Sequence, residues 1–460
     1  MTTVVILSVG VAIAVGLPIA WRVRQRRFDP FEPIVVFALA WGVMFVVRPI
    51  AIVVRDDTNF YGVDIGPTLD DAVLLGLVGA VAFAFGYWLP FGKHLAARLP
   101  AVAQGTPSSA ALVWSVVVAC VGLALLALVI VPGEGLDGVE TFLGGRSEAL
   151  DEIIDNSSNY LWYGSLVVVP AALVSAALAL EARTASAIAL ALALGAMALL
   201  RAVPTGNRVF LVVLVGGFVV FAYLRTARRP GIVAMCLGIV VALVASRAVL
   251  EVRDPETRRD VPTILRAIVT TPKSAFSPLY RGPDAEMAPA LAGAMTAIPD
   301  PLGYRFGGAT FGDVVLRPVP RELWDDKPRP HITVVTEEVW PVAVETGGFN
   351  PAFTPVLAFY WDFWVFGVVA GMGLLGVLAR SVWEYFLRFE SSFSAQLLFA
   401  TALCYLVVVL RHDHVLTSVW ALILFVPLVA ILRFAPTGCA LASDRRGELR
   451  GIHSADVPDA

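Results

Sequence analysis

The sequence predicts an all-α polytopic membrane protein with one large external loop that contains short amphipathic helices. Of its 460 residues, 58% are hydrophobic and only 15% are charged, and the mean hydropathy is +0.78, which is not the composition of a soluble domain. Apolar segments of membrane-spanning length recur along the chain. They are interrupted over residues 251–352 by polar sequence rich in proline and arginine.

Each predicted span is an apolar run close to the length that a helix needs to cross a bilayer, about 17 to 25 residues. Backbone polar groups have no water partner in hydrocarbon, so a spanning segment must pair them internally as a helix. We expect about eleven spans. They lie near Thr3–Trp21, Phe31–Val54, Asp71–Pro90, Ala111–Pro132, Tyr160–Leu180, Ala185–Leu200, Arg208–Leu224, Gly231–Leu250, Phe353–Leu378, Phe393–Leu410 and Val415–Leu432. The spans of residues 1–250 precede the loop, those of residues 353–433 follow it, and residues 434–460 form a cytoplasmic tail.

Arginine and lysine are distributed unequally between alternate connections, which predicts the orientation because short basic loops stay in the cytoplasm. The N-terminus and the long loop are then outside and the C-terminus is inside. No basic segment precedes the first span and a basic stop follows it, so we expect an uncleaved anchor rather than a signal peptide. The residues assigned to the cytoplasmic side are Arg22, Arg24, Arg26, Arg27, Lys93, Arg98, Arg183, Arg225, Arg228, Arg229, Arg380, Arg388, Arg433, Arg445, Arg446 and Arg450.

The cysteines and the net charge argue against several functional classes. Cys120, Cys236 and Cys404 fall in predicted spans and Cys439 in the tail, so the external loop has neither a disulfide framework nor a cysteine-based zinc site. A formal net charge of −3 without an external basic tract argues against nucleic-acid binding. We expect neither a metal nor a cofactor.

The long loop has an organisation of its own. Residues 261–269 and 284–297 carry apolar side chains at helical spacing, with Asp284 as an N-cap, which predicts two short helices on the outer membrane surface. Prolines and glycines between residues 299 and 330 then impose turns and extended backbone. Asp313 and Glu337 with Glu338 flank these turns at no diagnostic spacing, and we expect them to be solvated.

Cationic side chains are concentrated in this loop. They are either ordinary solvated charges, paired with the interleaved carboxylates, or a surface for a polyanionic head group. Arginine suits a diphosphate because its planar fork donates two parallel hydrogen bonds to phosphate oxygens and stays charged. The cationic residues are Arg281, Arg305, Arg317, Arg321, Lys327, Arg329 and His331.

Arginines also lie at the ends of predicted spans. Arg48 precedes Pro49 near the outer end of one span, and Arg208 opens another after Pro204, Thr205, Gly206 and Asn207. An ionisable group at this depth either snorkels to water or faces a polar cavity.

A further polar cluster, beginning at Arg411, joins the last two predicted spans. It is either a tight polar hairpin or part of a site. Histidine is the side chain best matched to proton transfer near neutral pH, and a carboxylate can also act as a base. The candidate bases outside the membrane are His331, His412, Asp413 and His414.

Short motifs in the chain resemble one known family. Residues 320–328, PRELWDDKP, are similar to the phrase P-R-x-(apolar)-W-x-x-K-P in the large external loop of the bacterial Wzy-type O-antigen polymerases. Phe353–Leu378, aromatic and punctuated by glycines, resembles the helix that follows this loop in that family. Arg48-Pro49 and the stretch Thr205–Arg208 also resemble family features. The family commonly has an even number of spans with both termini inside, and the expected topology departs from that pattern.

The resemblance implies a glycosyltransferase that polymerises polyprenyl-diphosphate-linked oligosaccharide repeat units at the outer face of the bacterial cytoplasmic membrane, for cell-surface polysaccharide. Fixed cations would stabilise the leaving diphosphate without a metal, and direct displacement would invert the anomeric configuration. The implied partners are the lipid-linked oligosaccharide, membrane lipid and a chain-length regulator. The implied diphosphate contacts are Arg208, Arg321, Lys327 and Arg305, followed by Arg48 and Arg411; the preferred bases are His331 and His412, followed by Asp413 and His414.

Other functions stay open at this point. An O-antigen-ligase-like transferase shares the loop and its arginines and differs in its acceptor. A multispan lipid-sugar-dependent glycosyltransferase has an acidic residue in its first external loop, where Asp56 and Asp57 lie in this chain. A glycan or lipid transporter predicts charged residues midway along several spans, whereas most ionisable residues here cluster at outer ends and in one loop.

Overall fold

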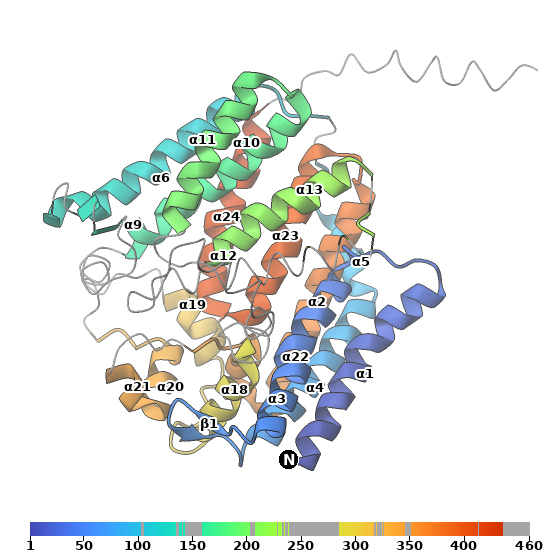
Figure 1. Cartoon of the computed structure of the whole chain (residues 1–460), viewed down its shortest axis with the longest axis vertical. Coiled ribbons are helices and arrows are strands. Elements are labelled where there is room, and N and C mark those ends of the chain that lie inside the picture. The colour runs from blue at the N-terminus through green and yellow to red at the C-terminus, as the bar shows by residue number, and fades with distance from the viewer. Residues whose placement is uncertain are drawn as a thin grey trace, which may run out of the picture.

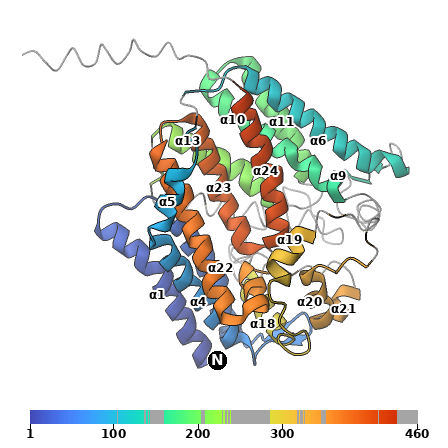
Figure 2. The same cartoon turned by 180° about the vertical axis from the view of Figure 1, so that it is seen from behind.

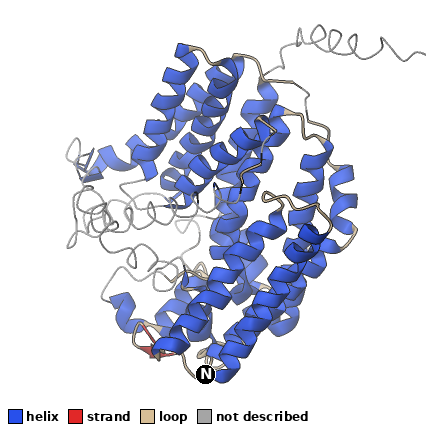
Figure 3. Ribbon diagram, turned by 45° about the vertical axis from the view of Figure 1, so that its right-hand side comes forward, coloured by secondary structure: helices blue, strands red, loops and turns tan. Residues whose placement is uncertain are grey.

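Apolar helices make up most of the molecule in the computed structural model, as Figures 1 and 3 show. The structure describes residues 1–102, 105–134, 159–202, 208–227, 229–231, 285–316, 326–345, 351–412 and 414–435, together with positions 138, 139, 141, 142, 234, 238, 319 and 324. Within these residues, nine helices are long and apolar enough to cross a membrane, and Val209–Arg225 is a shorter apolar helix. The span expected at Gly231–Leu250 lies largely outside the described residues. The chain is therefore an all-α, multi-pass membrane protein.

The elements follow one another as helices with a single short hairpin in the described part of the chain. The α-helices are α1 (Thr2–Arg24), α2 (Pro33–Gly42), α3 (Arg48–Arg55), α4 (Leu69–Trp88), α5 (Phe91–Arg98), α6 (Ala110–Glu134), α9 (Asn159–Gly164), α10 (Val168–Ala182), α11 (Ala185–Ala202), α12 (Arg208–Leu211), α13 (Gly217–Arg225), α18 (Met287–Met295), α19 (Asp313–Leu316), α20 (His331–Val339), α21 (Pro341–Glu345), α22 (Pro355–Arg388), α23 (Phe393–Arg411) and α24 (His414–Phe434). The wider π-helical turns are η1 (Val43–Val47), η3 (Val212–Gly216) and η5 (Gly308–Gly312), and η2 (Ser165–Val167) is a 3₁₀ turn. Strands β1 (Asn59–Phe60) and β2 (Val63–Asp64) pair antiparallel.

The elements of the long loop gather at one end of the helix bundle. Figure 1 shows the N-terminus, β1, α18, α20 and α21 together at the bottom of the molecule, which we call the loop end. Ion pairs assemble the predicted cytoplasmic connections elsewhere: Arg22 and Arg380 both lie against Glu32, and Arg229 lies 2.8 Å from Asp29. These ion pairs join the connection between α1 and α2 to the C-terminal part of α22 and to the residues after α13.

Helices α4 and α22 pack closely because glycines remove side chains from their interface. A Cβ atom on Gly86 would lie 2.0 Å from the carbonyl oxygen of Gly373, and one on Gly376 would lie 2.1 Å from the carbonyl oxygen of Phe83. Small residues let helix backbones approach in membrane proteins, where van der Waals packing replaces the hydrophobic drive between helices. This contact fixes α22, whose first turns contribute to the site described below.

A candidate span is present where one was expected at Phe353–Leu378, but α22 is broken near its beginning, which the sequence did not predict. Phe363 and Trp364 have non-helical backbone angles, and Trp364 has a positive φ of 54°. The first segment folds back on the second: a Cβ on Gly367 would lie 2.0 Å from the carbonyl oxygen of Phe359. The sequence reads as one apolar run because both segments are apolar, and only their mutual packing reveals the turn.

Helix α18 is buried, which corrects the prediction of an amphipathic helix on the membrane surface. Every residue from 287 to 294 is buried. Thr68 donates a hydrogen bond to the carbonyl oxygen of Ala292, and the ring of Trp340 packs against Gly293. A helix that is apolar around its whole circumference buries all its faces. The predicted N-cap Asp284 and the helix expected at 261–269 lie outside the described residues.

Candidate functional site

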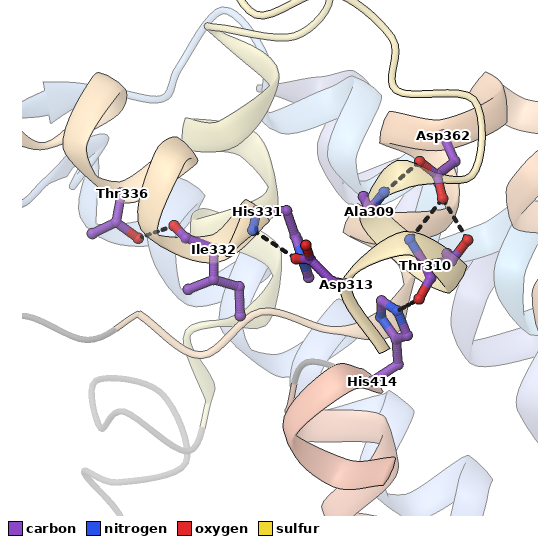
Figure 4. Close-up of polar contacts among 8 residues, drawn as sticks. All are labelled: Ala309, Thr310, Asp313, His331, Ile332, Thr336, Asp362 and His414. Carbon is purple, nitrogen blue, oxygen red and sulfur yellow. Dashed lines mark hydrogen bonds and ion pairs between the residues drawn. The ribbon is translucent and has the colours of Figure 1, made fainter. Parts of the chain in front are cut away.

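A buried network of polar side chains lies where η5, α19, α20, the broken start of α22 and the start of α24 meet. Figure 2 shows α19 beside the beginning of α24 and the lower part of α22. Figure 4 shows the residues of this network. It belongs to the loop end of the molecule, and its carboxylates accept hydrogen bonds from backbone N–H groups, a hydroxyl and a histidine ring.

Asp362 joins the break in α22 to the π-helical turn η5. Its side chain is fully buried, and its two oxygens accept hydrogen bonds from the backbone N–H groups of Ala309 and Thr310, each 2.8 Å long (Figure 4). The hydroxyl of Thr310 donates to the same carboxylate. Gly307, with φ of +96°, provides the left-handed turn from which η5 begins. A carboxylate at a helix N-terminus satisfies otherwise orphaned N–H groups and opposes the positive end of the helix dipole.

Asp313 and His331 form a second carboxylate contact in the network. One oxygen of Asp313 accepts from the backbone N–H of His331 at 2.8 Å and lies 2.6 Å from ring atom Nδ1 (Figure 4). His331 is 1% exposed and Asp313 is 8% exposed. The prediction that Asp313 is solvated is therefore wrong. His331 is the first residue of α20, so the same oxygen orients the ring and accepts from the start of that helix.

His414, the first residue of α24, lies against this pair. The rings of His331 and His414 stack with centroids 5.6 Å apart and planes at 28°. Atom Nε2 of His414 is 2.9 Å from the carbonyl oxygen of Thr310, which can only accept, so Nε2 carries the proton of this bond. Two candidate bases from distant parts of the sequence are thus brought into contact.

The Asp313–His331 pair has the arrangement of a carboxylate-oriented general base. Because Nδ1–H donates to the carboxylate, the neutral ring holds its basic lone pair on Nε2. The carboxylate fixes the tautomer and the orientation of the imidazole, and it stabilises the imidazolium that forms when the ring takes a proton. This geometry can support proton abstraction from a hydroxyl group.

Arg305 places a cation on the indole ring of Trp361, which in turn packs against His331. Its guanidinium carbon lies 4.5 Å from the centroid of Trp361, and the ring of His331 meets the same indole at 6.0 Å. Two hydrogen bonds hold this arrangement: the N–H of Arg305 donates to the carbonyl oxygen of Trp361, and the indole N–H donates to the carbonyl oxygen of Gly303. Stacking on an aromatic face preorganises arginine for anion recognition.

Arg48 belongs to a separate buried cluster at the loop end. Arg48 and Glu286 are 9% and 5% exposed, and the hydroxyl of Tyr61 donates to Glu286 at 3.2 Å. Burial raises the pKa of Tyr61 to about 12; Glu286 adds to this rise and Arg48 opposes it. Of the two alternatives for Arg48, the structure favours a polar interior over snorkelling to water.

His412 and Lys327 make contacts outside the His331 network. His412 lies 3.2 Å from the carbonyl oxygen of Val408 and packs edge-on against Trp420. Lys327 donates to the carbonyl oxygen of Val319 at 2.6 Å. Arg411, half-buried, ends α23.

Other sequence predictions lie partly beyond what the structure describes. Arg208 begins α12, directly before the π-helical turn η3, and nothing is described of its side chain. Arg321 and Asp413 lie outside the described residues. Asp56 and Asp57, the acidic pair of the alternative transferase, are exposed at the end of α3.

Sequence reasoning missed Asp362 and Thr310 as members of the network. A signal for Asp362 was present, because it is a lone carboxylate within an apolar segment, where an ionisable residue is costly and usually functional. No comparable signal marked Thr310, whose contribution comes from its backbone and hydroxyl.

Comparisons with known proteins add nothing to the class given by the fold, which is a multi-pass helical membrane protein. No protein-family model matches the chain, and no significant match was found among curated proteins or solved structures. In the described residues, no group of three or more histidine, cysteine, aspartate or glutamate side chains is arranged to hold a metal ion.

Proposed function

We propose that this protein is a glycosyltransferase that polymerises polyprenyl-diphosphate-linked oligosaccharide repeat units. The observation that carries the proposal is the buried Asp313–His331 pair, with Arg305 stacked on the intervening Trp361. A base and a cation at this spacing suit the transfer of a glycosyl group from a diphosphate to a hydroxyl. The resemblance of residues 320–328 and 353–378 to the O-antigen polymerases supports the same reaction.

The proposed step is a direct displacement at the anomeric carbon of the donor. The acceptor hydroxyl oxygen forms a bond to that carbon as the bond from the carbon to the diphosphate oxygen breaks. The hydroxyl proton passes to Nε2 of His331, and Asp313 stabilises the resulting imidazolium. The electron pair leaves with the polyprenyl diphosphate, whose negative charge Arg305 stabilises. The configuration at the anomeric carbon inverts.

Further residues enter the proposal from the sequence. Arg321, Lys327 and Arg208 are proposed diphosphate contacts on the basis of motif resemblance, and His414 supports the orientation of His331 by stacking on it. The loop end is proposed to face the outside of a bacterial cytoplasmic membrane, because the basic connections lie on the other set of helix ends.

The test is an extension assay with the purified protein in lipid nanodiscs and a polyprenyl-diphosphate oligosaccharide from the source organism. The wild-type protein should produce a ladder of longer lipid-linked glycans with inverted linkages. His331→Gln should lower kcat by about 10²- to 10⁴-fold, the range of general-base contributions. Asp313→Asn, which keeps the size of the side chain, should give a loss in the same direction.

Matched controls separate chemistry from folding. Arg305→Ala should lower kcat, whereas Arg329→Ala should not, because Arg329 is exposed in the same loop and pairs with Glu337. His94→Gln, an exposed change on α5, should also leave activity intact. A single transfer onto a different acceptor would favour a ligase. Full activity of folded His331→Gln would refute the assigned base, and no transfer by the wild-type protein would refute the proposed reaction.

A further inference from the structure

An exposed apolar surface covers the outer side of the segment that carries Asp313. It comprises Phe306, Phe311, Val315, Trp364 and Phe366, which we call the aromatic surface. Phe306, Phe311 and Phe366 are 77%, 72% and 76% exposed, and Val315 is 70% exposed. Exposure of several large apolar side chains side by side is unfavourable in water, so we expect another molecule to cover this surface.

The residues of the aromatic surface come together from two parts of the chain. The rings of Phe311 and Phe363 both approach Gly307, within 3.9 Å and 3.7 Å of the position of its Cβ. Trp364 and Phe366 are neighbours, with ring centroids 6.0 Å apart. The π-helical turn η5 packs directly on α22, which joins the two groups.

The aromatic surface continues onto a candidate membrane span. Beyond the break, α22 exposes Val369 one turn after Phe366 and Leu374 further along. In a multi-pass protein these exposed apolar residues face hydrocarbon, and tryptophan, such as Trp364, is enriched where a span meets the membrane interface. Continuity with this span identifies the occupant as the hydrocarbon chains of bilayer lipids.

The inner side of the same segment is polar. Phe311 and Val315 are four residues apart and share a face, whereas Asp313 between them is buried against His331 and Thr310 is buried against Asp362 (Figure 4). Residues 306–316 are therefore amphipathic across a single short segment. One side touches the polar network and the other side is apolar.

We propose that residues 306–316 and the break in α22 lie within the bilayer, with the aromatic surface in contact with lipid chains. The polar network would then sit directly behind a lipid-covered wall rather than under a solvated loop. This proposal does not depend on the reaction that the network carries out.

Cysteine accessibility tests the position of the aromatic surface. Phe311→Cys and Val315→Cys are made singly, with the four natural cysteines replaced by alanine. The purified proteins, in phosphatidylcholine nanodiscs, are treated with a charged, membrane-impermeant maleimide. Glu338→Cys, at an exposed position on α20, is the hydrated control, and Val369→Cys is the control within a span. Both test positions should react at least about tenfold more slowly than the hydrated control, because only the thiolate reacts and it forms in water.

Fluorescence quenching distinguishes lipid from protein as the covering partner. Subtracting the emission of Trp364→Phe from that of the wild type gives the fluorescence of Trp364. Dibrominated phosphatidylcholine in the nanodiscs should quench this fluorescence. Labelling of folded Phe311→Cys and Val315→Cys as fast as the hydrated control would overturn the proposal. Slow labelling without quenching of Trp364 would also overturn it, because the surface would then be covered by protein, such as a second copy of the chain.

Discussion

Replacing Gly86 by alanine tests the close approach of α4 and α22. The new Cβ would lie 2.0 Å from the carbonyl oxygen of Gly373, whereas Cβ contacts under 3.0 Å are essentially never observed. The two backbones must therefore move apart by about 1 Å, and a gap of about 0.5–1 Å already forfeits a quarter to a half of each van der Waals contact. Overpacking of this kind costs about 1–3 kcal/mol, and we expect the upper part of that range because the obstacle is backbone.

The assay is equilibrium unfolding by SDS in mixed micelles, followed by far-UV circular dichroism. Gly16→Ala and Gly195→Ala are matched controls, since no atom outside the adjacent residues and the helix's own backbone lies within 4 Å of either new Cβ. These controls should keep or raise the free energy of unfolding, by about 0.5–1 kcal/mol, because alanine has less freedom to lose than glycine in a helix. Equal free energies of unfolding for Gly86→Ala and Gly16→Ala would refute the reasoning about the interface.

Two further predictions concern polar groups that hydrogen-bond between elements, the buried Asp362 and the more exposed Tyr61. Asp362→Asn should lower the free energy of unfolding by about 2–4 kcal/mol in the same SDS assay, because an amide cannot accept all three hydrogen bonds now made by the carboxylate. Asp326→Asn, at an exposed position, should have little effect, and equal losses would contradict this account. Tyr61 ionises near pH 10 in the unfolded chain and at about 12 in the folded one, so its neutral form is favoured by folding. Its contribution to stability is fully present below pH 10 and is lost as the pH rises to about 12. Unfolding measured across this window should depend less steeply on pH in Tyr61→Phe, and identical slopes would remove Tyr61 from the explanation.

Some of the candidate site residues were predictable one at a time, but their grouping was not. His331 and His414 were candidates because imidazole suits proton transfer near neutral pH, and Arg305 because arginine suits a diphosphate. Their contacts were not predictable, since His414 meets a carbonyl oxygen 104 residues away in the sequence. His412 was preferred on the same grounds as His414, yet its ring turns to Val408 and Trp420.

The carboxylates show why local patterns were insufficient. Asp313 lies among prolines and glycines, which is typical of a solvated turn, and its burial depends on the arrival of His331 from 18 residues away. Asp362 is buried because η5 presents two N–H groups and a hydroxyl to it. Whether a carboxylate is buried or solvated depends on its donors, which come from other elements.

The sequence by itself determined the membrane class and most of the spans. These follow from the composition and from the length of apolar runs, because a segment that crosses a bilayer must be apolar and long enough whatever the rest of the chain does. The tertiary structure alone decided the break in α22, the burial of α18 and the meeting of Asp313, His331, Asp362 and His414. Each of these depends on close packing between distant segments, and packing is a property of pairs of surfaces that no single stretch of sequence contains.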